Sequence, residues 1–119
     1  MKKHKTLIIV LGVIAFLVII ATLGRFTNKP AGPEMIFFYG DTCPHCKNVE
    51  AYFTESGIEN KVKFQKLEVY NNTNNARLLA TTAKKCGLDT TNGVGVPVFY
   101  DGQQCFQGDQ PIIDFLKTK

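Results

Sequence analysis

Outside its N-terminal segment, the sequence lacks an excess of positive charge. Residues 30–119 hold nine basic and ten acidic side chains, a net charge of −1, although the whole chain carries +4. A nucleic-acid-binding domain needs a basic face on its folded part, and this part has no surplus of lysine or arginine to form one. We therefore expect no nucleic acid among the partners of the chain.

The sequence also lacks internal repeats and a glycine-rich phosphate-binding loop. Its 119 residues leave room for one domain, and its contents of hydrophobic residues (45%) and charged residues (20%) are those of a folded chain rather than a disordered one. The features that point to a function are therefore local: a long apolar segment and a group of four cysteines.

Charge is missing altogether from residues 7–24, a run of eighteen residues. A helix of that length spans roughly 27 Å, close to the thickness of the hydrocarbon core of a bilayer. Three lysines precede the run and only Arg25 and Lys29 follow it closely, so the positive-inside rule predicts a cytoplasmic N-terminus. We expect residues 1–6 to form a cytoplasmic n-region, residues 7–24 a transmembrane signal anchor in contact with membrane lipid, and residues 25–33 a linker.

A cleaved signal peptide is the main alternative for the same segment. The lysine-rich start suits one, but the apolar run exceeds the usual h-region of about 7–15 residues. No Ala-x-Ala cleavage motif follows the run, and no cysteine follows it closely for lipoprotein processing. We therefore prefer the uncleaved anchor, which puts residues 34–119, the predicted folded domain, outside the cytoplasm (in the periplasm or extracellular if the source is bacterial).

Strands and helices alternate along the predicted domain. Apolar and β-branched patterns predict four strands, over residues 34–39, 62–70, 96–100 and 103–107. Helix-capping residues predict three helices: one from Asp41 or Thr42 to Gly57, one from Asn72 or Thr73 to Gly87, and one capped by Asp109. Asp101-Gly102 suits a two-residue type I′ turn between the last two strands. The order β-α-β-α-β-β-α predicts an α/β domain with a four-stranded mixed sheet.

The most informative stretch is Cys43-Pro44-His45-Cys46, which opens a predicted helix directly after a strand. The unpaired N–H groups and the positive dipole end at a helix N-terminus stabilise a Cys43 thiolate, and His45 adds a hydrogen bond or a positive charge. A stabilised thiolate favours the dithiol form and makes the matching disulfide a stronger oxidant. The pattern predicts Cys43 and Cys46 as catalytic residues, with Pro44 and His45 tuning the pKa of Cys43.

Other uses of this cysteine pair stay open. A structural disulfide closes too short a loop here to stabilise the fold much. A zinc site needs a second closely spaced pair, whereas eighteen residues separate Cys86 from Cys105. Soft thiolates select copper(I), so a tethered copper-binding metallochaperone is the main alternative from another class, and a redox-inert assembly subunit is a third. We expect no metal ion and no cofactor other than the redox-active disulfide Cys43–Cys46 itself.

The chain resembles the thioredoxin superfamily. The resemblance covers residues 34–119 and rests on the Cys-Pro-His-Cys motif after the first strand and on Val96-Pro97 before a hairpin. The size and element order are similar to those of glutaredoxins, whereas Cys-Pro-His-Cys is the sequence carried by the DsbA class of periplasmic disulfide oxidants. The resemblance implies that Pro97 is a cis proline facing the active-site sulfurs and that the backbone of Val96 binds substrate.

Two departures from these families limit what the resemblance implies. DsbA proteins hold a helical domain between the cysteines and the proline, and the interval from Cys46 to Pro97 is too short for one. Glutaredoxins usually carry a lysine shortly before the cysteines that helps to hold glutathione, and Asp41 occupies that neighbourhood. Gly108-Asp109 is similar to the stretch that grips the amine of glutathione, although a helix cap explains it equally well. Glutathione is therefore not the expected substrate.

Cys86 and Cys105 form a second candidate pair. Cys86 continues the apolar stripe of the second predicted helix, whose other members are Ala76, Leu79, Ala80 and Ala83. If Asp101-Gly102 forms the turn, Cys105 lies opposite Val98 and on the same face of the sheet. A bridge closes about 20 residues and stabilises the fold by about 3 kcal/mol, and two buried free thiols are the alternative. We expect a structural disulfide that takes no part in turnover.

Together these features predict a membrane-anchored thiol–disulfide oxidoreductase that acts outside the cytoplasm. Its expected partners are protein thiols and disulfides and a membrane redox partner that recycles it, and its expected direction is oxidation. A disulfide reductase or isomerase, or a glutaredoxin-like reductant, is the alternative within the same class.

Overall fold

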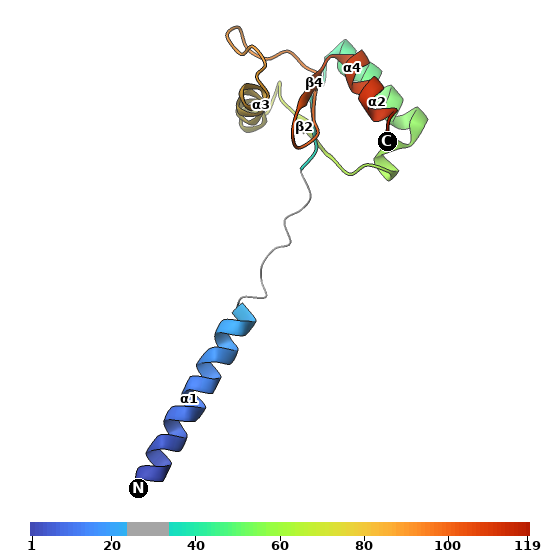
Figure 1. Cartoon of the computed structure of the whole chain (residues 1–119). Coiled ribbons are helices and arrows are strands. Elements are labelled where there is room, and N and C mark those ends of the chain that lie inside the picture. The colour runs from blue at the N-terminus through green and yellow to red at the C-terminus, as the bar shows by residue number, and fades with distance from the viewer. Residues whose placement is uncertain (24–33) are drawn as a thin grey trace. The chain divides into compact units, whose positions relative to one another are not determined.

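The computed structural model describes residues 1–23 and 34–119, and the predicted linker, residues 25–33, lies outside the described residues. The chain divides into two units, the first of which holds a single helix, α1 (Lys2–Leu23; Figure 1). By its length and composition α1 can cross a membrane, and its apolar window, Lys2–Ala21, is not buried by any other part of the described chain. A signal sequence meets the same criteria, so both interpretations of this segment stay open.

The second unit is built on a four-stranded mixed sheet. Its strands follow the spatial order β2-β1-β3-β4 and are β1 (Ile36–Tyr39), β2 (Gln65–Glu68), β3 (Val98–Tyr100) and β4 (Cys105–Gln107). β1 pairs in parallel with β2 and antiparallel with β3, and β3 pairs antiparallel with β4. The helices are α2 (Pro44–Ser56), α3 (Thr73–Lys85) and α4 (Asp109–Leu116), with a short 3₁₀ helix, η1 (Ile58–Asn60), after α2. The predicted fold class and element order are confirmed, although every strand is shorter than predicted.

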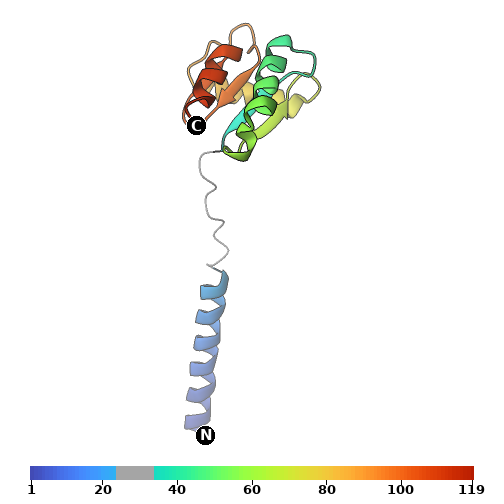
Figure 2. The ribbon, with the colours of Figure 1, turned by 90° about the vertical axis from the view of Figure 1, so that its right-hand side faces the viewer.

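Side chains alternate along β1, so its residues belong to two buried clusters, one on each face of the sheet. Phe37 packs on the face covered by α2 and α4, against buried residues that include Phe53 and Ile112. Ile36 and Phe38 pack on the opposite face, which α3 covers. Figure 2 shows α2 and α4, in green and red, side by side on their face. β1 is thus buried on both faces, as its uninterrupted apolar sequence predicts.

The start of α2 differs from the prediction. Neither Asp41 nor Thr42 is the N-cap. That position is held by Cys43, whose Sγ accepts a hydrogen bond from the backbone N–H of Cys46 at 3.1 Å. Pro44 explains the shift, because a proline at the first helical position presets the helical φ and keeps the residue before it extended. The cap of the helix is therefore one of the predicted catalytic residues.

The other ends of α2 and α3 lie where the sequence predicts. Gly57 ends α2 in the left-handed conformation, at φ 63°. The side chain of Asn72 caps α3, and Gly87 follows that helix at φ 76°. The predicted apolar stripe of α3 is wrong at Ala80, which is exposed.

The connection between β3 and β4 is longer than predicted. A four-residue loop, residues 101–104, replaces the two-residue turn, and the Asp101 carboxylate accepts hydrogen bonds from two backbone N–H groups of the loop. The longer loop shifts the register, so Cys105 pairs with Tyr100 and not with Val98. Because side chains alternate with a period of two, this two-residue shift leaves Cys105 on the face that α3 covers.

The structure joins Cys86 and Cys105 in a disulfide, the pairing that the sequence favours. Their Cα atoms lie 5.8 Å apart, and both residues are half-buried against the cluster between α3 and the sheet. The bridge links the end of α3 to β4, which lies at the edge of the sheet.

Candidate active site

Cys43 and Cys46 form a disulfide at the start of α2, with their Cα atoms 5.2 Å apart. Cys46 is completely buried, whereas Cys43 keeps 4% of its surface exposed. Cys43 is therefore the more accessible residue of the pair.

Two backbone groups lie close to Cys43 Sγ. The N–H of Cys46 donates a hydrogen bond to it at 3.1 Å, and the carbonyl oxygen of Val96 lies 3.6 Å from it. In reduced protein, the N–H donor stabilises a thiolate on Cys43, and the carbonyl can accept a hydrogen bond from the protonated thiol. The sulfur thus has a backbone partner in either protonation state.

The segment opposite the disulfide contains the peptide bond Val96–Pro97, which is cis, as the resemblance implies. Pro97 is fully buried, and its carbonyl oxygen accepts a hydrogen bond from the N–H of Gly108 at 3.0 Å. Within residues 34–119, no backbone group pairs with the N–H of Val96. An unpaired main-chain group next to the sulfur can pair with an extended peptide.

Pro44 and His45 occupy the first turn of α2, and the side chain of His45 is 70% exposed. His45 Nδ1 lies 3.1 Å from Asp109 Oδ2, which also accepts a hydrogen bond from Asn48 Nδ2 at 2.7 Å. Hydrogen bonds from Asn48 and His45 hold the pKa of Asp109 at about 2, below its ordinary value of 3.8. The Asp109 carboxylate is therefore charged throughout the physiological pH range.

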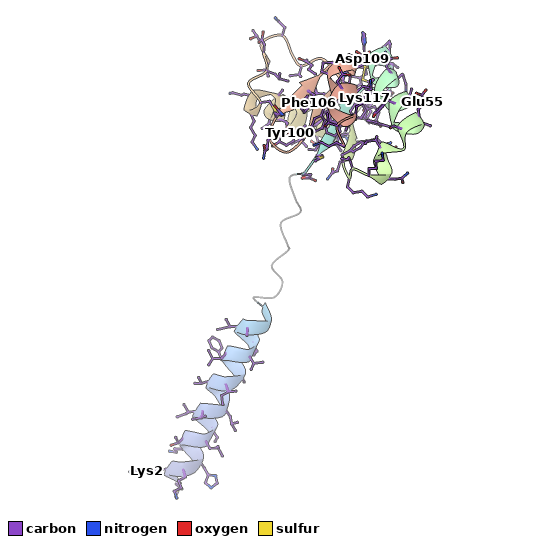
Figure 3. All side chains as sticks on the ribbon, turned by 45° about the vertical axis from the view of Figure 1, so that its right-hand side comes forward. Lys2, Glu55, Tyr100, Phe106, Asp109 and Lys117 are labelled. Carbon is purple, nitrogen blue, oxygen red and sulfur yellow. A yellow bond between two sulfur atoms is a disulfide. The ribbon has the colours of Figure 1, made fainter. Side chains whose placement is uncertain are left out.

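The predicted capping role of Asp109 is wrong. Gly108 holds the N-cap position of α4 and Asp109 is its first helical residue, located beside the first turn of α2 (Figure 3). The hydrogen bond from Asn48 to Asp109 was not predicted from the sequence either. His45 and Asn48 lie three residues apart and so share a face of α2, but only the packing of α4 on α2 brings Asp109 to that face.

The segment that follows β2 contacts the loop that leads to Cys43. The ring of Tyr70 packs so closely on Gly40 that a Cβ added at Gly40 would overlap it. Asn71 Nδ2 donates a hydrogen bond to the Asp41 carboxylate at 2.9 Å. Asp41 thus holds the loop to the neighbouring chain segment and does not cap α2.

The described residues contain no group of three or more His, Cys, Asp or Glu side chains that could hold a metal ion. The second cysteine pair is bridged within itself and adds no ligand to Cys43 and Cys46. The first pair itself offers two sulfurs with backbone groups beside Cys43, a set that can take part in thiol–disulfide exchange.

Comparisons with known proteins add little to these observations. No protein-family model and no curated protein match the chain. Among solved structures, the chain is similar to the holo form of glutaredoxin C1 from Populus tremula x tremuloides, with 16% sequence identity and a TM-score of 0.48 over 71% of this chain and 75% of that chain. An identity this low says nothing about activity.

The fold assignment rests on the chain itself. A β2-β1-β3-β4 sheet with two helices on one face and one on the other, a Cys-x-x-Cys disulfide at the first helix of this unit and a cis proline before β3 make up a glutaredoxin-like fold.

Proposed function

We propose that the chain is a membrane-anchored thiol–disulfide oxidoreductase that oxidises protein thiols outside the cytoplasm. The observation that carries the proposal is the Cys43–Cys46 disulfide at the start of α2, with Cys43 Sγ 3.6 Å from the carbonyl oxygen of Val96. A reducible bond at a helix N-terminus, next to the unpaired N–H of Val96, supports disulfide exchange with an extended protein segment.

The reaction proceeds in two exchange steps. A substrate thiolate attacks Cys43 Sγ, and the electron pair of the S–S bond leaves with Cys46 Sγ, which takes up a proton. A second substrate thiolate then attacks the substrate sulfur of the mixed disulfide, and Cys43 Sγ leaves as a thiolate. Two electrons pass from the substrate dithiol to the cysteine pair, and a redox partner in the membrane must accept them before the next cycle.

The direction of the reaction is proposed from Pro44-His45, the dipeptide that the cysteines enclose as in the DsbA class, and from the leaving group. In the second step Cys43 leaves as a thiolate, and the N–H of Cys46, 3.1 Å from Sγ, stabilises that charge. A thiolate of low pKa leaves faster and favours the dithiol form of the pair. The backbone of Val96 and the buried ring of Pro97 hold the substrate segment beside the sulfur during both steps.

The location is proposed from α1 and from the second disulfide. The apolar run of α1, which follows Lys2, Lys3 and Lys5 in the same helix, supports a single-pass anchor in contact with lipid, with the N-terminus in the cytoplasm. A Cys86–Cys105 bridge supports an oxidising compartment for the domain, because such bonds persist outside the cytoplasm. Full-length protein should stay in the membrane fraction after an alkaline wash, with the Met1 end intact by mass spectrometry. Loss of the N-terminal residues would instead indicate a cleaved signal peptide.

Trapping of the mixed disulfide tests the activity. The Cys46→Ser variant of the full-length chain should accumulate protein adducts on Cys43 that vanish with reductant. Its Cys43 thiolate attacks a substrate disulfide, the reverse of the second step, and no Cys46 thiol is left to displace the substrate from the mixed disulfide. Cys43→Ser is the matched control: it keeps one cysteine of the pair but loses the reachable one, and we expect no adducts. If Cys46→Ser captures nothing while the wild-type chain binds copper(I) stoichiometrically, the metallochaperone replaces the oxidoreductase.

A further inference from the structure

The carboxylate of Asp109 connects two helices at the candidate active site. Its Oδ2 accepts a hydrogen bond from Asn48 and lies 3.1 Å from Nδ1 of His45, both on α2, whereas Asp109 itself begins α4. Its Oδ1 accepts a hydrogen bond from the N–H of Gln110, in its own helix. Two of the three donors therefore come from the helix that carries the cysteines.

The charge of the Asp109 carboxylate determines which nitrogen of the His45 imidazole carries the hydrogen of their shared bond. A charged carboxylate can only accept hydrogen bonds, so Nδ1 of His45 carries the shared hydrogen and Nε2 is left for other partners. Within the described residues, Asp109 is the only hydrogen-bond partner of the His45 side chain, which is 70% exposed. Without Asp109, the ring would rotate freely in solvent.

We infer that Asp109 is a positioning residue, which holds the imidazole of His45 over the first turn of α2 so that it stabilises the Cys43 thiolate. The role of Asp109 in turnover rests on the proposed function, whereas its effect on the stability of the Cys43 thiolate does not. Asp109 touches neither sulfur in this assignment and acts only through His45.

The direction in which the pKa of the Cys43 thiol changes when Asp109 is removed distinguishes action through His45 from a direct effect of the Asp109 charge. If Asp109 acted directly, removing its negative charge would stabilise a nearby thiolate and lower the pKa of the Cys43 thiol. If it acts through His45, its removal releases the imidazole, and the pKa of the Cys43 thiol rises instead. The first effect persists when His45 is absent, and the second disappears.

The experiment measures alkylation of Cys43 by iodoacetamide as a function of pH, in the reduced full-length chain carrying Cys46→Ser, with the Cys43 peptide quantified by mass spectrometry. We expect Asp109→Ala to slow alkylation below the pKa by about threefold, the change for half a pKa unit. In a His45→Ala background the same substitution should have no slowing effect. Asp109→Glu, which restores a carboxylate, should recover most of the rate.

Asp114→Ala is the matched control, because Asp114 is also a carboxylate on α4 but bonds Gln110 and not α2. It should leave the alkylation profile unchanged, and thermal unfolding of each variant monitors the fold. Faster alkylation of Asp109→Ala, an unchanged profile, or the same slowing in the His45→Ala background would overturn the assignment. If the alkylation pattern holds while Cys46→Ser traps no substrate, the proposed function fails and the role of Asp109 stands.

Discussion

Removing the Cys86–Cys105 disulfide should destabilise the domain by a predictable amount. The two cysteines are 19 residues apart in the sequence, and a cross-link over such a loop lowers the entropy of the unfolded chain enough to stabilise the fold by about 3 kcal/mol. For a domain of this size each kcal/mol changes Tm by about 4–8 °C, so the Cys86→Ala/Cys105→Ala variant should melt roughly 12–24 °C lower. The half-buried sulfurs add only a small packing loss.

The assay is denaturant unfolding of the full-length chain, oxidised, with α1 kept in detergent. The matched control is Cys43→Ala/Cys46→Ala, which removes a bridge between residues only 3 apart and should cost no more than about 2 kcal/mol. A loss below 1 kcal/mol in the first variant, or a larger loss in the control than in the first variant, would refute the reasoning from loop length. The double substitution should leave trapping by Cys46→Ser unchanged, since the second bridge takes no part in turnover.

Three further predictions concern the core, the loop before Cys43 and the pH dependence of stability. Phe37→Ala, at a fully buried position between the sheet and α2, should lower the free energy of unfolding by about 3–5 kcal/mol in urea melts, and a loss under 1 kcal/mol would contradict the packing. Gly40→Ala should destabilise the domain because of overlap with the Tyr70 ring, and less so when Tyr70→Ala is also present; equal losses in both backgrounds would exclude that clash. Since the pKa of Asp109 is about 2 in the folded chain and 3.8 ordinarily, its ionisation stabilises the fold above pH 4 and that contribution is lost as the pH falls towards 2. Thermal melts between pH 5 and 2 should therefore show a smaller decrease in Tm for Asp109→Asn than for wild type, and parallel curves would argue against the bonds to Asn48 and His45.

The elements that the sequence predicted well are those fixed by local patterns. The uninterrupted apolar residues of β1 and the left-handed glycine Gly57 are found in their predicted roles, and Asn72, one of the two caps predicted for α3, is the cap observed. The cap of α2 could also have been predicted correctly, because Pro44 at the first helical position leaves Cys43 as the residue before the helix.

The parts that the sequence did not predict depend on tertiary contacts or on competing local hydrogen bonds. Asp101 can serve either a two-residue turn or a longer loop, and its side-chain bonds to the loop N–H groups favour the longer one. Asp109 has the residue type and position of a helix cap, yet its carboxylate bonds α2, which no spacing within the sequence reveals. The cysteine pair was therefore predictable from the sequence, whereas the surroundings of His45 were not.

The reduction potential of the Cys43–Cys46 pair tests the central claim most directly. The full-length chain is equilibrated with glutathione buffers, and the oxidised fraction of this pair is measured from the Cys43–Cys46 peptide. We expect a potential near the oxidising end, roughly −120 mV, as a donor of disulfides to protein thiols requires. A value near about −270 mV would contradict the account, because such a pair would act as a reductant.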